Sequence, residues 1–400
     1  MPQPRRPEFL VIFLTVLVTT IGFGVIFPIL PTYARHLGAD DWINGWLVAV
    51  FSLAQFVFAP WWGRLSDKIG RRPVMLISTL GSAAAYALTG WAHTIPLLFV
   101  ARLLDGATGG SVAVAQACLA DLTKPEERSK TMALIGVAFG LGFVIGPFVG
   151  GELASHFGPS MPFYFISGLS LLNTAWIWFK LPETLAPENR SGNQPRQGLS
   201  ALVRQPNGRV FVRVVALYFL FLTGFSVMTF VYTLFNAQRF GFDEKMNGRL
   251  FGMIGVIGII VQGGLVRRWL PKWGEKPLVL AGAAILAASF FLLPLSWSFG
   301  MLIAVSCAIA FANSLIQPTL NGLVSRSVDA ASQGRALGIF QSAASLGRAL
   351  GPVLGGVLLH LDGPATYGRA PLWLAAGLLA AMLLLALPLP REIKDEEKPA

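Results

Sequence analysis

One pair of oppositely charged residues lies inside an apolar run, where it could hold and release a proton. Arg102 and Asp105 are three residues apart, so a helix would place both on one face. Ionisable residues at membrane depth are functional by default, because an unpaired charge in hydrocarbon is costly. Burial opposes ionisation of Asp105 while Arg102 favours it. The pair is therefore a candidate for proton exchange, and a self-neutralising structural pair is the alternative.

A strongly basic segment stands between two other apolar runs. It covers residues 63–73 and reads GRLSDKIGRRP. A loop this short cannot house a domain, so its cations would sit at a membrane surface. We expect Gly63 and Gly70 to permit tight turns that a Cβ would strain.

The same segment supplies residues for a charge network. Asp67 and Arg71 are four residues apart, and Asp121 closes a later apolar run on the same side of the membrane. Opposite charges at these places can form hydrogen-bonded ion pairs. The alternative is that the cations, Arg71 and Arg72 among them, act only as topology anchors.

The elements that carry these residues are apolar runs long enough to cross a bilayer. Apolar residues make up 54% of the chain, charged residues only 13%, and the mean hydropathy is +0.62, whereas soluble domains hold about 25% charged residues. The runs are continuous, unlike the alternating segments of a barrel, and therefore predict an all-helical membrane protein. Twelve spans are expected near 9–31, 43–62, 74–92, 96–121, 130–152, 162–181, 210–238, 247–266, 277–296, 299–322, 334–358 and 370–390.

The charge distribution predicts orientation and argues against some partners. Of the 31 Lys and Arg residues, 24 fall on the side that holds the N-terminus, which predicts that both termini are cytoplasmic. The net charge of +11 lies in clusters between apolar runs, so nucleic-acid binding is not expected. Both cysteines lie in apolar runs and all four histidines at outer helix ends. We therefore expect no disulfide framework, no metal site and no cofactor.

An internal repeat divides the chain. The segment 141–151, LGFVIGPFVGG, aligns with 346–356, LGRALGPVLGG, at an offset of 205 residues, and GRRP at 70–73 matches GEKP at 274–277. The one long polar interruption lies between these copies. We predict a six-helix bundle over 1–181, a cytoplasmic linker over 182–208, and a second six-helix bundle over 209–400, related by a parallel repeat.

The repeated segment is rich in small residues that permit close approach of two membrane helices. Its prolines are expected to bend the helices. The predicted packing motif consists of Gly142, Gly146, Pro147, Gly150, Gly151, Gly351 and Pro352.

With these motifs the chain resembles a major facilitator superfamily transporter of the twelve-helix drug:proton antiporter type. The resemblance covers nearly the whole chain. It rests on the basic segment, on Arg102 with Gly106 and Gly110, on the repeated GPxxGG, and on the run from Ile21 to Pro31. The sequence ADLT at 120–123, which ends the fourth predicted span, and QGG at 262–264, in the eighth, look closest to tetracycline efflux proteins. The acidic residues usual in the first and third helices of those proteins appear here as Thr19 and about Ala85.

The resemblance implies roles for two sets of residues. The first set would latch the two bundles together through Gly63, Asp67, Gly70, Arg71, Arg72, Asp121 and Arg335. The second set would line a central substrate cavity, which helices 1, 4, 7 and 10 surround in this superfamily; it comprises Thr19, Thr20, Gln116, Phe225, Tyr232, Asn236, Asn313 and Gln317.

The function expected from all of this is secondary active transport by alternating access. We predict proton-coupled export of lipophilic or amphiphilic small molecules such as drugs, by a monomer in the cell membrane. Import or uniport of a polar metabolite or sugar is the alternative, and a non-transporting membrane receptor is the alternative of another class. An enzyme is not expected, because the sequence holds no HExxH, GxSxG or P-loop motif.

Overall fold

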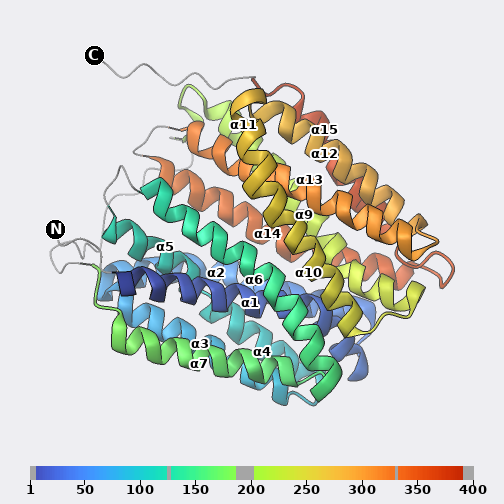
Figure 1. The fold of residues 1–400 in the computed structure, drawn as a ribbon, viewed down its shortest axis with the longest axis horizontal. Helices are drawn as coiled ribbons and strands as arrows, with labels where there is room; N and C mark the ends of the chain where they lie inside the picture. Colours follow the sequence, from blue (N-terminus) through green and yellow to red (C-terminus); the bar gives the residue numbers. More distant parts are fainter. Residues whose placement is uncertain (1–5, 124–127, 186–201, 329–331, 391–400) are drawn as a thin grey trace. The chain divides into compact units, whose positions relative to one another are not determined.

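The computed structural model describes residues 6–123, 128–185, 202–328 and 332–390. Within these ranges every regular element is a helix, and the helices are long (Figure 1). Among the described residues, eleven helices are long and apolar enough to be candidate membrane spans. The predicted span that is absent from these eleven is the sixth, which the structure forms as the 20-residue helix Met161–Lys180; its Tyr, Asn and Trp residues lower its hydropathy. The prediction of an all-α membrane protein is confirmed.

The helices before residue 186 correspond to the first six predicted spans. They are α1 (Arg6–His36), α2 (Asp41–Ile69), α3 (Arg71–Trp91), α4 (Ile95–Thr108), α5 (Ser111–Leu122), α6 (Arg128–Phe157) and α7 (Met161–Lys180).

The helices after residue 202 correspond to the other six spans. They are α9 (Gly208–Phe240), α10 (Glu244–Ile260) with the π-helical turn η2 (Val261–Val266) and α11 (Arg267–Trp273), α12 (Glu275–Leu292) with the 3₁₀ turn η3 (Leu293–Leu295), α13 (Phe299–Arg326), α14 (Gln333–Leu361) and α15 (Arg369–Ala386).

Two predicted spans are interrupted helices. The fourth span breaks at Gly109 and Gly110 between α4 and α5, where Trp62 fills the space that a Cβ on Gly110 would need. The Trp62 indole N–H also donates to the Ala107 carbonyl at 2.6 Å, which satisfies a backbone group near the break. The eighth span passes through η2, at whose centre Gly263 lowers helix propensity.

The prediction of a tight turn at Gly63 is wrong. Helix α2 continues through Gly63 to Ile69, and nothing lies within 4 Å of the position of a Cβ there. The apolar run marks only the part of the helix that lies in lipid, and the polar residues beyond it extend the helix further. The turn at Gly70 is confirmed, because its φ of 107° is open mainly to glycine.

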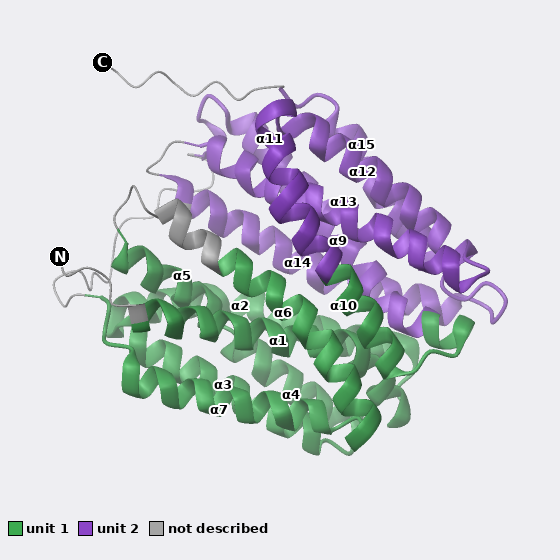
Figure 2. Ribbon diagram, viewed as in Figure 1, with its two compact units in different colours: residues 1–194, 236–255 green, residues 195–235, 256–400 purple. Residues whose placement is uncertain are grey.

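The chain forms two compact units (Figure 2). Unit 1 comprises residues 1–194 and 236–255, and unit 2 comprises 195–235 and 256–400. These units differ from the predicted halves mainly in residues 236–255, the end of α9 and the start of α10, which belong to unit 1. These residues belong to unit 1 because Gly248 of α10 and Gly151 of α6 bring the two helix backbones into contact. A Cβ added to either glycine would lie about 3.1–3.2 Å from the Cα atom of the other.

Each unit contains the same glycine seam. In unit 1, α1 lies against α6, where a Cβ on Gly142 would collide with Thr20 and one on Gly146 with the backbone of Ile21. In unit 2, α9 lies against α14, where Gly347 meets Phe219 and Thr223. Gly142 and Gly347 differ by the repeat offset of 205 residues. The predicted small-residue packing is therefore present in both units.

Candidate functional site

The charged pair predicted inside the membrane is formed in unit 1. The Arg102 Nη1 donates to Asp105 Oδ2 at 2.7 Å, and the two side chains are 1% and 5% exposed. Among the described residues, Asp105 is the only acidic residue that lies inside a candidate membrane span and more than eight residues from both of its ends. Its carboxyl is therefore removed from both membrane surfaces.

Helices α2 and α3 complete the surroundings of this pair. The Arg102 guanidinium lies over the Phe51 ring of α2, 4.5 Å from its centroid, an arrangement that stabilises a desolvated cation. From α3, Ser82 interacts electrostatically with Asp105, and the Tyr86 hydroxyl with both members of the pair. The Arg102 Nε is buried without a hydrogen-bond partner. The site thus has one donor position that a bound molecule or a rearrangement could satisfy.

Close helix contacts hold the pair in position. Gly106, one residue after Asp105, meets the Phe51 backbone and Ala54 on α2, so a Cβ there would collide with both. Gly81 on α3 likewise accommodates Thr108 of α4. Because α4 is held between α2 and α3 at this depth, the acid–base pair sits on a rigid support.

The predicted charge network is also formed in unit 1. Arg71 donates through Nη1 to Asp67 at 2.6 Å and through Nε to Asp121 at 3.1 Å, and Ser66 accepts a further bond from Nη1. Asp67 is 52% exposed whereas Arg71 is 11% exposed. Arg335 lies in the first turn of α14 in unit 2, so the latch that would join it to Asp67 stays a prediction.

Sequence reasoning gave no role to Glu183, which is central to this end of unit 1. Its carboxylate accepts the backbone N–H groups of Arg71 at 2.8 Å and Arg72 at 3.2 Å. It thereby caps α3, whose N-cap residue Gly70 has no side chain. Arg72 in turn donates to the Trp178 carbonyl at 2.6 Å and lies over its ring. The conspicuous Leu-Pro-Glu-Thr sequence after α7 was the available signal.

Unit 2 has a counterpart of this network with the charges reversed. Gly274, with a φ of 73°, precedes Glu275, whose carboxylate pairs with Arg326 at the end of α13. In unit 1, Gly70 precedes Arg71, which pairs with Asp121 near the end of α5. The repeat thus preserves the placement of an ion pair and inverts its polarity.

The residues predicted to line a cavity do not all present free polar groups. Thr20 is buried and donates to the Val16 and Ala138 carbonyls in the α1–α6 seam, so its predicted cavity role stays a prediction. Asn236 is buried against Asn247, and Tyr232 is hydrogen-bonded to Ser306 at 2.6 Å.

The other predicted cavity residues are more accessible. In unit 1, Gln116 is exposed, and Thr19 is half-buried next to Ser111 at 3.2 Å. In unit 2, Gln317 is exposed, while Phe225 and Asn313 are half-buried. These five side chains remain candidates for substrate contact.

A further ion cluster connects α6 and α10 in unit 1. Glu152 pairs with Arg249 at 2.7 Å and with Lys245 at 3.4 Å, and His156 is 3.8 Å away. Such pairs are screened by solvent and contribute little to stability. No group of three or more potential metal-ligating side chains is found among the described residues.

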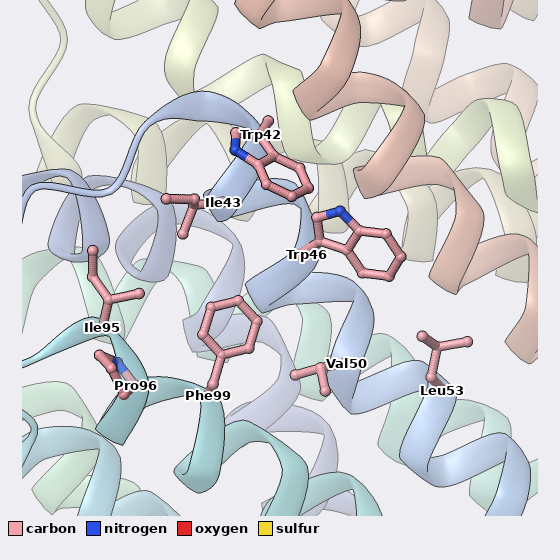
Figure 3. Close-up of a pocket in the computed structure, with 8 residues that line it drawn as sticks. All are labelled: Trp42, Ile43, Trp46, Val50, Leu53, Ile95, Pro96 and Phe99. Atoms are coloured by element: carbon pink, nitrogen blue, oxygen red, sulfur yellow. The ribbon is translucent and has the colours of Figure 1, made fainter.

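An apolar groove of about 670 Å³ lies along α2 and α4 (Figure 3). Trp42 and Trp46 at the start of α2 form one part of it, and Phe99 of α4 lies between them and Pro96 in the close-up. The remaining lining side chains are Ile43, Val50, Leu53 and Ile95. With no charged group it offers lipophilic contact only, and tryptophans at a helix end are typical of the membrane interface.

The fold and the buried ion pair define a multi-pass α-helical membrane protein of the transporter class. The profile of the Major Facilitator Superfamily matches residues 12–328 and 265–400. The chain belongs to this superfamily. It is 31% identical over 390 residues to the class H tetracycline resistance protein of Pasteurella multocida, covering 94% of this chain and 95% of that protein.

Two further similarities extend the comparison. The chain is 29% identical to multidrug resistance protein 2 of Bacillus subtilis, with 90% of each chain covered. The crystal structure of the human organic anion transporter MFSD10 (TETRAN) superposes with a TM-score of 0.74 at 28% identity, covering 96% of this chain and 100% of that one. The resemblance predicted from the motifs is therefore confirmed.

Proposed function

We propose that this transporter is a proton-coupled antiporter that exports lipophilic or amphiphilic small molecules across the cell membrane. The single observation that carries the proposal is the buried Asp105 in its pair with Arg102. A carrier that exchanges protons for substrate needs one group that can be charged in one state and neutral in another. A carboxyl group held away from both membrane surfaces fulfils this requirement.

The surroundings of Asp105 support a change of protonation. When the carboxyl takes up a proton, Arg102 loses its counter-ion but keeps the Phe51 ring and the Tyr86 hydroxyl. The Arg102 cation would therefore still be partly stabilised after Asp105 is protonated. Coupling follows if the two charge states of Asp105 favour different conformations of the carrier.

The names of the similar proteins support the substrate class. They include tetracycline resistance, multidrug resistance and organic anion transport. The strong bias of Lys and Arg toward one side supports placing both termini in the cytoplasm. The charge network around Arg71 would then lie at the cytoplasmic face, where a latch between conformations is expected.

Flux into proteoliposomes under an imposed pH gradient tests the proposal. The panel consists of tetraphenylphosphonium, 2-naphthoate, 2-naphthamide and glucose. We expect uphill accumulation of at least one aromatic compound, its loss with a protonophore, and no flux of glucose. If no compound in the panel is driven by the gradient, proton-coupled export of amphiphiles is refuted, and glucose flux would favour a sugar carrier.

Variants of the acid test the residue assignment. Asp105→Asn should abolish uphill transport and preserve downhill exchange, which also reports that the protein is folded. Because removing one partner of a buried ion pair is destabilising, the double variant Asp105→Asn with Arg102→Gln is the second test. Asp40→Asn is the matched control, since Asn caps α2 as well as Asp does. Full uphill transport in either Asp105 variant would remove this residue from coupling.

A further inference from the structure

Unit 2 contains an arginine near the middle of a membrane span. Arg348 lies near the centre of the 29-residue α14, its side chain is half-buried, and its Nη2 donates to Ser345 Oγ at 2.9 Å. A hydroxyl is a neutral acceptor and leaves the positive charge uncompensated. A cation at this depth is costly, and such residues mark substrate or ion pathways.

No acidic residue in the described part of unit 2 is placed to neutralise Arg348. Among the described residues of this unit, Glu275 begins α12 and pairs with Arg326, and Asp362 follows the end of α14. A rise of 1.5 Å per residue puts Asp362 about 20 Å along the helix axis from Arg348. Arg102 in unit 1, by contrast, has its carboxylate three residues away.

The fold does not require an arginine at this position. The repeat offset of 205 residues relates Arg348 to Phe143 on α6 in unit 1. Phe143 packs against Phe23 and Phe27 of α1, with ring centroids 5.9 and 6.0 Å apart. An apolar side chain therefore packs at the equivalent position of the α1–α6 seam. Packing alone does not require a charged residue at position 348, so we look for another reason for the charge of Arg348.

The surroundings of Arg348 offer hydrogen-bonding and aromatic groups from two more helices. Gly347 holds α14 against α9, and Arg348 interacts electrostatically with Tyr218 of α9. The exposed Gln317 of α13 interacts electrostatically with the Tyr218 hydroxyl. The Tyr218 ring stacks on Phe340 at 3.8 Å between centroids and lies 6.1 Å from Phe221. A cation, an amide and an aromatic cluster thus meet in unit 2.

We propose that Arg348 is a substrate-binding residue that holds the anionic group of an amphiphilic aromatic substrate. The inference rests on the proposed function and narrows its substrate class to organic anions. A guanidinium binds a planar carboxylate through two parallel N–H···O bonds. Gln317 supplies a further amide near this position. The half-buried Phe225 of α9, whose ring centroid lies 5.8 Å from that of the buried Phe221, offers aromatic surface for a flat apolar body.

Equilibrium binding to the purified protein in detergent tests this assignment without any ion gradient. The probes are 2-naphthoate, 2-naphthamide and 2-naphthylmethylammonium, which share one aromatic body and differ in charge. The intact protein should bind the anion most tightly. Arg348→Gln should weaken 2-naphthoate binding at least about ten- to a hundredfold, because a single hydrogen bond to a charged group accounts for that factor and the variant loses both guanidinium bonds. Binding of 2-naphthamide should be unchanged.

Three further variants separate charge from folding. Arg348→Phe installs the residue of the equivalent position in unit 1, so it should fold and lose anion binding as Arg348→Gln does. Arg348→Lys should retain part of the preference, because the charge remains without the planar fork. Arg213→Gln is the matched control, an arginine of unit 2 that donates to the Pro388 carbonyl and is expected to leave binding unchanged.

Two results would overturn the assignment. Unchanged 2-naphthoate binding in Arg348→Gln and Arg348→Phe would exclude Arg348 from the site. Equal loss for the anion and the amide would show that the residue only supports the structure. Because binding is measured without a gradient, these outcomes are independent of whether Asp105 couples transport to protons.

Discussion

Replacement of Glu183 by alanine should loosen the start of α3 specifically. The Glu183 carboxylate accepts two backbone N–H groups of the first turn, those of Arg71 and Arg72, and a third from Leu185. The N-cap position is Gly70, which has no side chain to replace these bonds. In Glu183→Ala the two helix donors are left to water, and the negative charge at the positive end of the helix is lost.

The size of the effect follows from these contacts. Loss of an N-cap costs about 0.5–2 kcal/mol, and loss of a charge at a helix terminus about 0.3–1 kcal/mol. Because Glu183 is half-buried, we take about 2 kcal/mol for the sum, which corresponds to about thirtyfold in the local opening equilibrium. Glu183→Gln keeps one acceptor oxygen and loses the charge, so about 1 kcal/mol, or about fivefold, is expected there.

Amide hydrogen exchange of the first turn of α3 measures this opening directly. We expect exchange there to accelerate about thirtyfold in Glu183→Ala and about fivefold in Glu183→Gln. The first turn of α12, which follows the equivalent Gly274, is the internal control and should not change. Acceleration below about twofold in the alanine variant would refute the capping role of Glu183, and equal acceleration in α12 would indicate general destabilisation.

Two other predictions concern packing and the charge network. Gly146→Val should destabilise the protein by about 1–3 kcal/mol, because the added methyl groups would collide with the backbone of Ile21 and Gly24. Gly168→Val, with open space around its Cβ, should change stability by no more than about 0.5 kcal/mol. Thermal unfolding in detergent compares the two variants, and equal destabilisation would contradict the close α1–α6 packing. Asp67→Asn should slow transport strongly if Asp67 belongs to the latch. Expression and thermal stability should stay near normal, because the Asp67 side chain is 52% exposed. An unchanged transport rate would leave Asp67 as part of a topology anchor.

The sequence was most informative where a feature is local. Run length predicted the spans, and glycine spacing predicted the seam in which Gly142 and Gly347 bring two helices together. It failed at Gly63, since a change from apolar to polar residues marks the edge of lipid rather than the end of a helix.

Contacts between distant segments could not be predicted from the sequence. Glu183 reaches α3 across more than 100 residues, and only the folded chain shows that Glu275 and Arg326 mirror Arg71 and Asp121 with reversed charge. The burial of Thr20 in the α1–α6 seam could not be predicted for a related reason. Which face of a helix meets its neighbour depends on the rotation of the helix about its axis, and a polar residue type alone does not fix that rotation.

Proton release on substrate binding tests the central claim most directly. Purified protein in lightly buffered detergent solution is mixed with the substrate that shows the largest gradient-driven flux, and the change in pH is recorded. The account predicts that the intact protein releases protons when substrate binds, and that Asp105→Asn binds the same substrate and releases none. Equal proton release from both proteins would contradict the assignment of Asp105 as the coupling residue.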